Sequence, residues 1–121
     1  IFIVKVKIEI FNQGENIRDY IHVRDLAYAH QLAIELGSDG IYNVGSGTGY
    51  SNQEIINRFE IDFSVDVHKA RRRKGDATSL VADISHAKKK LGWEPKHGID
   101  DIIYDLNEWY NSNNYRGRVN G

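Results

Sequence analysis

Two short arginine motifs carry the residue types of this chain that could hold a phosphorylated sugar. The first places Arg18 two residues before Tyr20, and the second places Arg73 three residues before Asp76. A guanidinium group can bind phosphate oxygens through paired hydrogen bonds, while a carboxylate or a phenol can bond to hydroxyl groups. Two separated arginines can flank one diphosphate. The sequence therefore predicts a substrate-binding site formed by Arg18, Tyr20, Arg73 and Asp76.

Both motifs also have plainer interpretations. Arg18 beside Asp19 could be a surface ion pair worth less than about 1 kcal/mol, and the basic run around Arg73 could be a solvated loop. A nucleic-acid surface is a weaker alternative, because it needs basic residues spread over a face, usually with aromatic side chains for stacking. Asp76 at the end of the run would oppose a phosphate backbone but suits ribose hydroxyls. The diphosphate interpretation is therefore favoured over nucleic-acid binding.

The sequence predicts no catalytic, cofactor-binding or metal-binding residues. The glycine-rich segment 45–49 precedes a capping box, and helix N-termini bind anions. It does not match G-x-G-x-x-G and lacks the Walker lysine, so a structural turn is predicted. No Tyr-x-x-x-Lys pair occurs in the sequence. The five histidines show no metal-ligand spacing, and His22 is expected to be a satisfied structural histidine.

Length and composition are those of one ordinary domain. The chain has 121 residues, a formal net charge of −1 and no cysteine. Such a balance gives no reason to expect bulk attraction to nucleic acid or membranes, and the lack of cysteine mildly favours a reducing compartment. No long apolar stretch suggests a membrane span. We expect a cytoplasmic, single substrate-binding domain over residues 1–121, with a frayed tail over 112–121.

Strand and helix patterns alternate along the chain, which predicts an α/β fold. The expected strands are 4–10, 41–44 and 63–67, and the expected helices are 26–36, one after the capping box at 51–54, 83–91 and 99–110. Asp25 and Asp83 are the expected N-caps of their helices. Gly37 and Gly92 are expected to end helices.

The motifs, taken in order, resemble the C-terminal part of UDP-glucose 4-epimerases, which are extended short-chain dehydrogenases/reductases. The matching segments are Gly14 with 17–23, then 25–30, 42–51, 72–76 and 82–95. Together with the residues between them they cover most of 8–110. The resemblance implies the substrate-binding portion of a Rossmann-type fold whose N-terminal dinucleotide-binding domain is missing from these residues.

The resemblance also implies the roles of the four site residues. Arg18 and Arg73 would hold the diphosphate of a UDP-sugar, Asp76 would bond to the ribose, and Tyr20 would lie beside the nucleotide. The parent reaction would convert UDP-glucose to UDP-galactose through an NAD-dependent 4-keto intermediate. Such a grip supplies remote binding energy and does no chemistry itself.

Several expectations follow for the chain alone. It should be inactive and bind no cofactor, and it should expose an apolar patch where the NAD-binding domain of the parent enzyme would pack. Two alternatives remain open at this point. The chain could be a non-catalytic module that binds UDP-sugars, or a structural domain that self-associates through its apolar surface.

Overall fold

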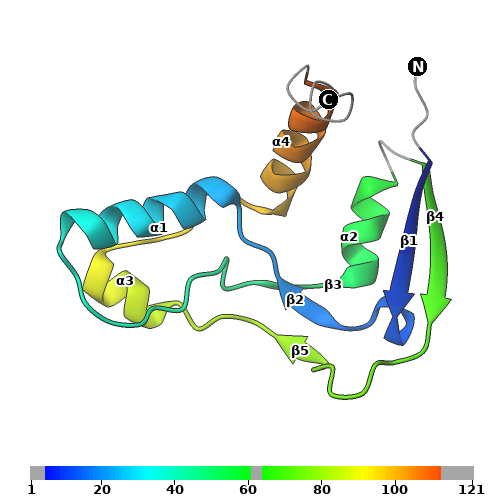
Figure 1. The fold of residues 1–121 in the computed structure, drawn as a ribbon, viewed down its shortest axis with the longest axis horizontal. Helices are drawn as coiled ribbons and strands as arrows, with labels where there is room; N and C mark the ends of the chain where they lie inside the picture. The colour runs from blue at the N-terminus through cyan, green and yellow to red at the C-terminus, as the bar shows by residue number, and fades with distance from the viewer. Residues whose placement is uncertain (1–4, 61–63, 113–121) are drawn as a thin grey trace, which may run out of the picture.

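Strands and helices alternate through the part of the chain that the structure describes. This computed structural model describes residues 5–60 and 64–112. The elements in chain order are β1 (Lys5–Phe11), the 3-10 turn η1 (Asn12–Gly14), β2 (Ile17–Asp19), α1 (Val23–Glu35), β3 (Gly49–Ser51), α2 (Asn52–Phe59), β4 (Ser64–Ala70), β5 (Ser79–Leu80), α3 (Ser85–Leu91) and α4 (Ile99–Asn111). The alternation confirms the predicted α/β class (Figure 1).

Two small sheets position the arginine motifs, one motif within β2 and the other in the connection between β4 and β5. β1 and β4 pair in parallel, and β2 lies between antiparallel β3 and parallel β5. Arg18 is in the centre of β2, opposite Tyr50 on one side and Leu80 on the other. The pairing of β5 with β2 brings the segment 71–78 alongside β2, with a hydrogen bond from the Ile17 N–H to the Thr78 carbonyl at 2.9 Å. Two motifs separated by more than fifty residues thus meet in the middle of the molecule.

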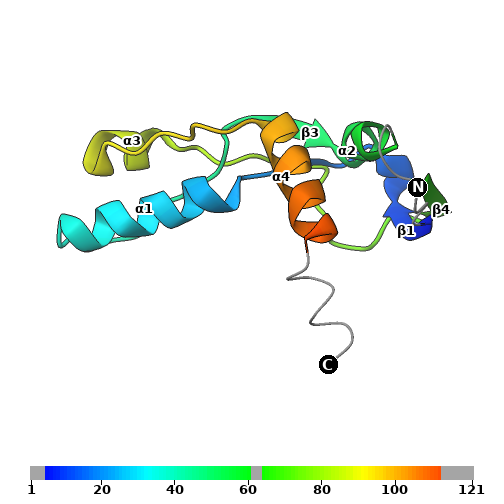
Figure 2. The ribbon, with the colours of Figure 1, turned by 90° about the horizontal axis from the view of Figure 1, so that it is seen from above.

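The apolar interior is divided into two clusters. The α1–α3 cluster consists of Ala29, Ile84, Ala87, Leu91 and Trp93, with partly buried neighbours around them. The α2–α4 cluster consists of Ile55, Ile99 and Ile103, against which Tyr20 and Tyr50 pack. Figures 1 and 2 show α1 and α3 at one end of an elongated molecule and α2, β1 and β4 at the other. The β2–β3–β5 sheet connects the two ends.

The N-terminus of α1 differs from the prediction. The helix begins at Val23, and its N-cap is His22, whose Nδ1 accepts a hydrogen bond from the Arg24 N–H at 3.0 Å. Asp25 was the wrong choice of N-cap, because its carboxylate bonds to His97 instead. The alternation of Ile21 and Val23 also predicts a short extended segment before Asp25, and this is wrong at Val23, which opens the helix. Gly37, with a φ of +59°, follows the end of α1 as predicted.

The predicted strand over 41–44 is wrong. Its backbone pairs with no other strand in the described chain, and the Ile41 side chain is 91% exposed. Tyr42 and Val44 pack against the α1–α3 cluster, which explains the alternating apolar pattern without a strand. The short strands β2, β3 and β5 were not predicted.

Most helix signals are confirmed. Ser51 Oγ accepts from the Glu54 N–H at 3.1 Å, and Glu54 Oε2 accepts from the Ser51 N–H at 2.7 Å, so the capping box of α2 is present. α3 ends at Gly92, whose φ is +64°. The Asp83 carboxylate does accept from the first N–H of α3, that of Ser85, although Ile84 occupies the N-cap position itself.

Parts of other predictions fall outside the described residues. β4 runs from Ser64 to Ala70, and the strand prediction at position 63 lies outside the described range, as does position 4. Of the predicted frayed tail, only Ser112 is described, and its Oγ donates to the Trp109 carbonyl at 2.6 Å. The single-domain assignment stays a prediction.

A buried polar link joins α1, α4 and the segment before α4. Asp25 is 2% exposed, and its carboxylate accepts from His97 Nδ1 at 2.9 Å and from the His97 N–H at 3.0 Å. The His22 ring lies 4.5 Å from the His97 ring, centroid to centroid, and its Nε2 is 2.7 Å from Asp105. Since Nδ1 of His22 accepts from the backbone, Nε2 is the donor to Asp105. The prediction of a satisfied structural histidine at His22 is confirmed.

Because of this link, the folding stability should depend on pH in the acid range. Burial alone would raise the pKa of the Asp25 carboxyl, but hydrogen bonds from the His97 side chain and from the Lys96 and His97 backbone, with attraction by His97, hold it below its ordinary value of 3.8. A lowered pKa in the folded state stabilises the fold above that ordinary value, and the contribution is lost as pH falls through the folded pKa. We therefore expect the free energy of unfolding to fall in acid.

Urea denaturation of the wild-type chain and of Asp25→Asn, at neutral pH and at about pH 3, measures this contribution. The variant should be less stable at neutral pH, and the difference between the two proteins should shrink in acid. An unchanged difference across this range would contradict the role assigned to Asp25.

Large apolar side chains are exposed on three different parts of the structure. They include Ile34, Leu36 and Ile41 at and beyond the end of α1, Leu80 and Val81 at β5, and Tyr104, Leu106 and Trp109 on α4. That they form one patch larger than a normal monomer exposes stays a prediction. Among the described residues, no helix is long and apolar enough to cross a membrane.

Candidate functional site

All four predicted site residues line a single pocket of about 320 Å³. Arg18 and Tyr20 come from β2 and the residue after it, whereas Arg73 and Asp76 come from the segment between β4 and β5. Ile55 and Ile56 of α2 supply apolar surface on the same pocket. We call this cavity the Asp76 pocket. Its volume is at the lower end of the range of small-molecule sites.

The Arg18 side chain is directed to the Asp76 carboxylate and not to that of Asp19. Its Nη2 lies 2.7 Å from Asp76 Oδ1, and its Nη1 donates to the Ile17 carbonyl at 2.8 Å. Successive side chains of a strand point to opposite faces, so Arg18 and Asp19 diverge. The interpretation of Arg18 and Asp19 as a surface ion pair is therefore wrong.

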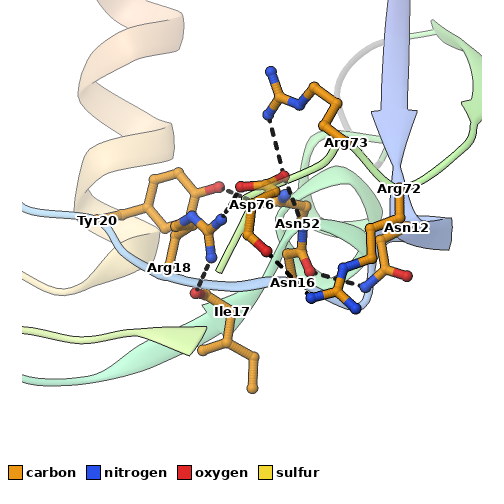
Figure 3. A network of polar contacts seen from close by, with 9 residues as sticks. All are labelled: Asn12, Asn16, Ile17, Arg18, Tyr20, Asn52, Arg72, Arg73 and Asp76. Atoms are coloured by element: carbon orange, nitrogen blue, oxygen red, sulfur yellow. Dashed lines mark hydrogen bonds and ion pairs between the residues drawn. The ribbon is translucent and has the colours of Figure 1, made fainter. Parts of the chain in front are cut away.

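Asp76 lies at the centre of the polar network shown in Figure 3. Its Oδ2 is 3.3 Å from Arg73 Nη2 and accepts from Asn16 Nδ2 at 3.1 Å. A turn closed by the Asp76 N–H and the Arg73 carbonyl, with Gly75 at a φ of +80°, returns the carboxylate toward Arg73. The Arg73 guanidinium also lies over the Phe11 ring, 4.1 Å from its centroid. Both arginines therefore converge on one carboxylate.

Tyr20 forms another side of the pocket. Its hydroxyl donates to Asn52 Oδ1 at 2.6 Å. Burial raises the pKa of the Tyr20 phenol above its ordinary value of 10.0, and the positive charge of Arg18 opposes part of that shift. The phenol is therefore neutral and a hydrogen-bond donor at neutral pH.

Two asparagines of the pocket were missed by the sequence analysis. Asn16 is 1% exposed and is held in turn by Asn12 Nδ2, which donates to its Oδ1 at 2.9 Å. Asn52 opens α2 and receives the Tyr20 hydroxyl. Both lie in polar segments that looked like a turn and a helix start, and no local pattern marks either one as a pocket residue.

The glycine-rich segment 45–49 serves the fold. Asp19 accepts from the Ser46 N–H at 2.7 Å, the Gly47 N–H at 3.0 Å and the Ala82 N–H at 3.2 Å. A Cβ on Gly45 would come within 2.5 Å of the Asp19 carboxylate. The backbone donors that a dinucleotide pyrophosphate would need are therefore already bonded to Asp19. The predicted structural turn is confirmed, and these residues do not fit a dinucleotide loop.

The Asp76 pocket combines groups that suit an anionic ligand with hydroxyl groups. Two guanidiniums can neutralise phosphate charge, one carboxylate can accept from hydroxyls, and a neutral phenol borders an apolar wall. Asp76 is only 15% exposed, so its bonds are partly shielded from water. The arrangement is suited to binding and orienting a ligand.

Comparison with known proteins gives consistent similarities. The sequence model described as GDP-mannose 4,6 dehydratase matches residues 4–106. UDP-glucose 4-epimerase of Bacillus subtilis (strain 168) is 44% identical over an alignment of 106 residues, and the match covers 83% of this chain and 31% of that protein. The chain thus spans about a third of the length of the curated relatives it matches.

Solved structures show the same partial coverage. UDP-glucose 4-epimerase from Bifidobacterium longum, in complex with NAD⁺ and UDP, is 34% identical with a TM-score of 0.74, over 87% of this chain and 35% of that chain. The enzyme from Thermotoga maritima with UDP-glucose is 31% identical with a TM-score of 0.75, over 86% and 34% respectively.

Proposed function

The chain belongs to the GDP-mannose 4,6-dehydratase family of extended short-chain dehydrogenases/reductases, and on this premise we propose that it is the UDP-sugar-binding, C-terminal portion of a nucleotide-sugar 4-epimerase. The family agrees with the resemblance drawn from the ordered motifs. The proposed parent reaction interconverts UDP-glucose and UDP-galactose through a 4-keto intermediate. The 121 residues, which contain no Tyr-x-x-x-Lys pair, would not catalyse it alone.

The convergence of Arg18 and Arg73 on one pocket is the observation that carries this proposal. They come from different segments, and their guanidiniums lie 2.7 Å and 3.3 Å from the two oxygens of the Asp76 carboxylate. Groups so close together can contact adjacent phosphates of one diphosphate. Each charge-assisted hydrogen bond would contribute about 1.5–3 kcal/mol. Asp76 would accept from the ribose, and Tyr20 would border the nucleotide.

Such a site anchors the nucleotide and leaves the sugar free to turn. Binding energy from a remote, non-reacting part of the substrate can then be used at the reacting centre. NAD would supply hydride transfer at the sugar in the parent enzyme. The glycine-rich loop does not fit NAD, because its donors are bonded to Asp19. We assign NAD binding to the two thirds of the relatives' length that this chain does not span.

Titration of the chain with UDP at low salt, followed by amide NMR shifts, tests the proposal. UDP should shift the amide signals of Arg18, Arg73 and Asp76, and uridine should not. Arg73→Ala should weaken UDP binding about 10- to 100-fold, the effect of one lost charge-assisted bond. Arg71→Ala is the matched control: it removes the same charge from the same exposed run, outside the pocket. It should leave the affinity nearly unchanged.

Two results would contradict the proposal. Equal weakening by both variants would mean that bulk charge, and not the pocket, attracts UDP. A well-dispersed spectrum that ignores UDP would mean that the fold is kept without a nucleotide site. If that protein also oligomerised with concentration, the alternative of a self-associating structural domain would be favoured.

A further inference from the structure

The Asp76 carboxylate is bonded in the way that a bound anion would be. Each of its oxygens faces a guanidinium, with Arg18 Nη2 at 2.7 Å from Oδ1 and Arg73 Nη2 at 3.3 Å from Oδ2. Asn16 Nδ2 adds a neutral donor to Oδ2 at 3.1 Å. Figure 3 shows these donors arranged around the carboxylate. A phosphate that uses the same guanidiniums meets a negative charge already bonded to them.

We propose that Asp76 is a specificity-determining residue: its carboxylate competes with ligand phosphates for Arg18 and Arg73, so the pocket rejects bare anions and accepts anions that carry hydroxyl donors. This inference rests on the proposed function, in which these arginines bind a diphosphate. It adds the expectation that inorganic anions bind weakly, which the presence of two arginines alone would not give.

The competition follows from charge and hydrogen bonding. A bare diphosphate that takes the guanidiniums places its charge beside a carboxylate that has lost its cationic partners, and like charges at such distances repel. A partly buried carboxylate without partners is costly. A ligand with hydroxyl groups near its phosphates can donate to Asp76 and so replace the lost bonds. Selectivity therefore comes from an unfavourable element as well as from attraction.

Asp76 cannot easily turn away from the pocket. Asn16, which holds Oδ2, is 1% exposed and is itself bonded to Asn12. The backbone of Asp76 is held at both polar groups. The Asp76 N–H donates to the Arg73 carbonyl at 3.2 Å, and the Asp76 carbonyl is contacted by Arg72 Nη2 at 3.4 Å. Asn16 is therefore a positioning residue that keeps the competing carboxylate in place.

The two guanidiniums, in contrast, are anchored without Asp76. Arg18 Nη1 donates to the Ile17 carbonyl at 2.8 Å, and Arg73 lies over the Phe11 ring. Replacing the carboxylate should therefore leave both cations facing the pocket. This makes Asp76→Asn, which has the same shape without the charge, a direct test of competition.

The experiment measures the affinities of inorganic diphosphate and of UDP for the wild-type chain and Asp76→Asn, by calorimetry at one low salt concentration. Asp76→Asn should bind inorganic diphosphate about tenfold more tightly than the wild type and UDP no more tightly. Asp39→Asn is the control, because it removes one exposed carboxylate far from the pocket and changes the net charge equally. Asp76→Ala removes the carboxylate and its side-chain bonds altogether, and its affinity for inorganic diphosphate is a second measurement of the same effect. Circular dichroism checks that each variant is folded.

The proposal is overturned if inorganic diphosphate binds Asp76→Asn and Asp76→Ala no more tightly than the wild type, or if Asp39→Asn produces the same gain. If either result is found while the wild type binds UDP, the proposed competition by Asp76 is rejected and the proposed function is kept. When the wild type does not bind UDP but Asp76→Asn still gains affinity for diphosphate, the proposed function fails and the competition stands.

Discussion

Trp93→Ala is expected to remove a large part of the folding stability of the chain. Trp93 is fully buried in the α1–α3 cluster, and its Nε1 donates to the Asp25 carbonyl at 2.9 Å. Truncating a buried tryptophan costs about 3–5 kcal/mol, and whole domains are stable by only about 5–15 kcal/mol. The substitution also leaves the Asp25 carbonyl without its hydrogen-bond donor, and the Asp25 side chain is the group that bonds to His97. Urea denaturation followed by circular dichroism measures the effect.

Two matched variants separate packing from hydrogen bonding at this position. Trp93→Phe keeps most of the ring but loses the N–H, so it should cost less, about 1–3 kcal/mol. Tyr104→Ala removes an aromatic side chain that is largely exposed on α4 and should cost within about 0.5 kcal/mol. If Trp93→Ala were no more harmful than Tyr104→Ala, the α1–α3 cluster would not be the main source of stability that its burial indicates.

Asp19→Ala should produce the second large loss, about 3 kcal/mol, because several donors lose one acceptor at once. The carboxylate accepts from the backbone N–H groups of Ser46, Gly47 and Ala82 and from the Ser46 hydroxyl. These bonds join β2 to the glycine-rich loop and to the segment leading into α3. Without them, the loop has no other partner for these N–H groups in the described structure.

Ser46→Ala is the control for Asp19→Ala. Of the bonds to Asp19 it removes only that of the Ser46 hydroxyl, together with the contacts of this hydroxyl to Thr48, and it should cost about 1–2 kcal/mol. Thermal unfolding of both variants, with the wild type, measures the difference. Equal midpoints for the two variants would show that the backbone donors find water instead, and that Asp19 does not organise the loop.

The sequence predicted elements whose signals are local. The capping box of Ser51 and Glu54 and the left-handed turn at Gly92 depend on residues a few positions apart, so the sequence alone could reveal them. The strand prediction for 41–44 was wrong because packing of every second side chain against a cluster gives the same apolar alternation as a strand. Strands of two or three residues, such as β5, form only because a distant partner is present, and no local pattern predicts them.

The pocket could be predicted in part for the same reason. Arginine and acid motifs identified Arg18, Tyr20, Arg73 and Asp76, and the structure places all four on one cavity. The sequence did not show that Asp76 would bond to both arginines, since that depends on β5 pairing with β2. The sequence could not predict Asn16 either, because an asparagine in a polar turn gives no sign of being buried.

The way in which both clusters combine distant parts of the chain has a consequence for cleavage of the backbone. The α1–α3 cluster draws on residues within 21–44 and within 82–93, and the α2–α4 cluster draws on residues within 20–59 and within 99–103. A break in the exposed stretch 71–75 therefore leaves two fragments, each holding only part of each cluster. Neither fragment keeps a complete cluster. The two pieces would need to reassociate, as separate subunits do, before either could fold.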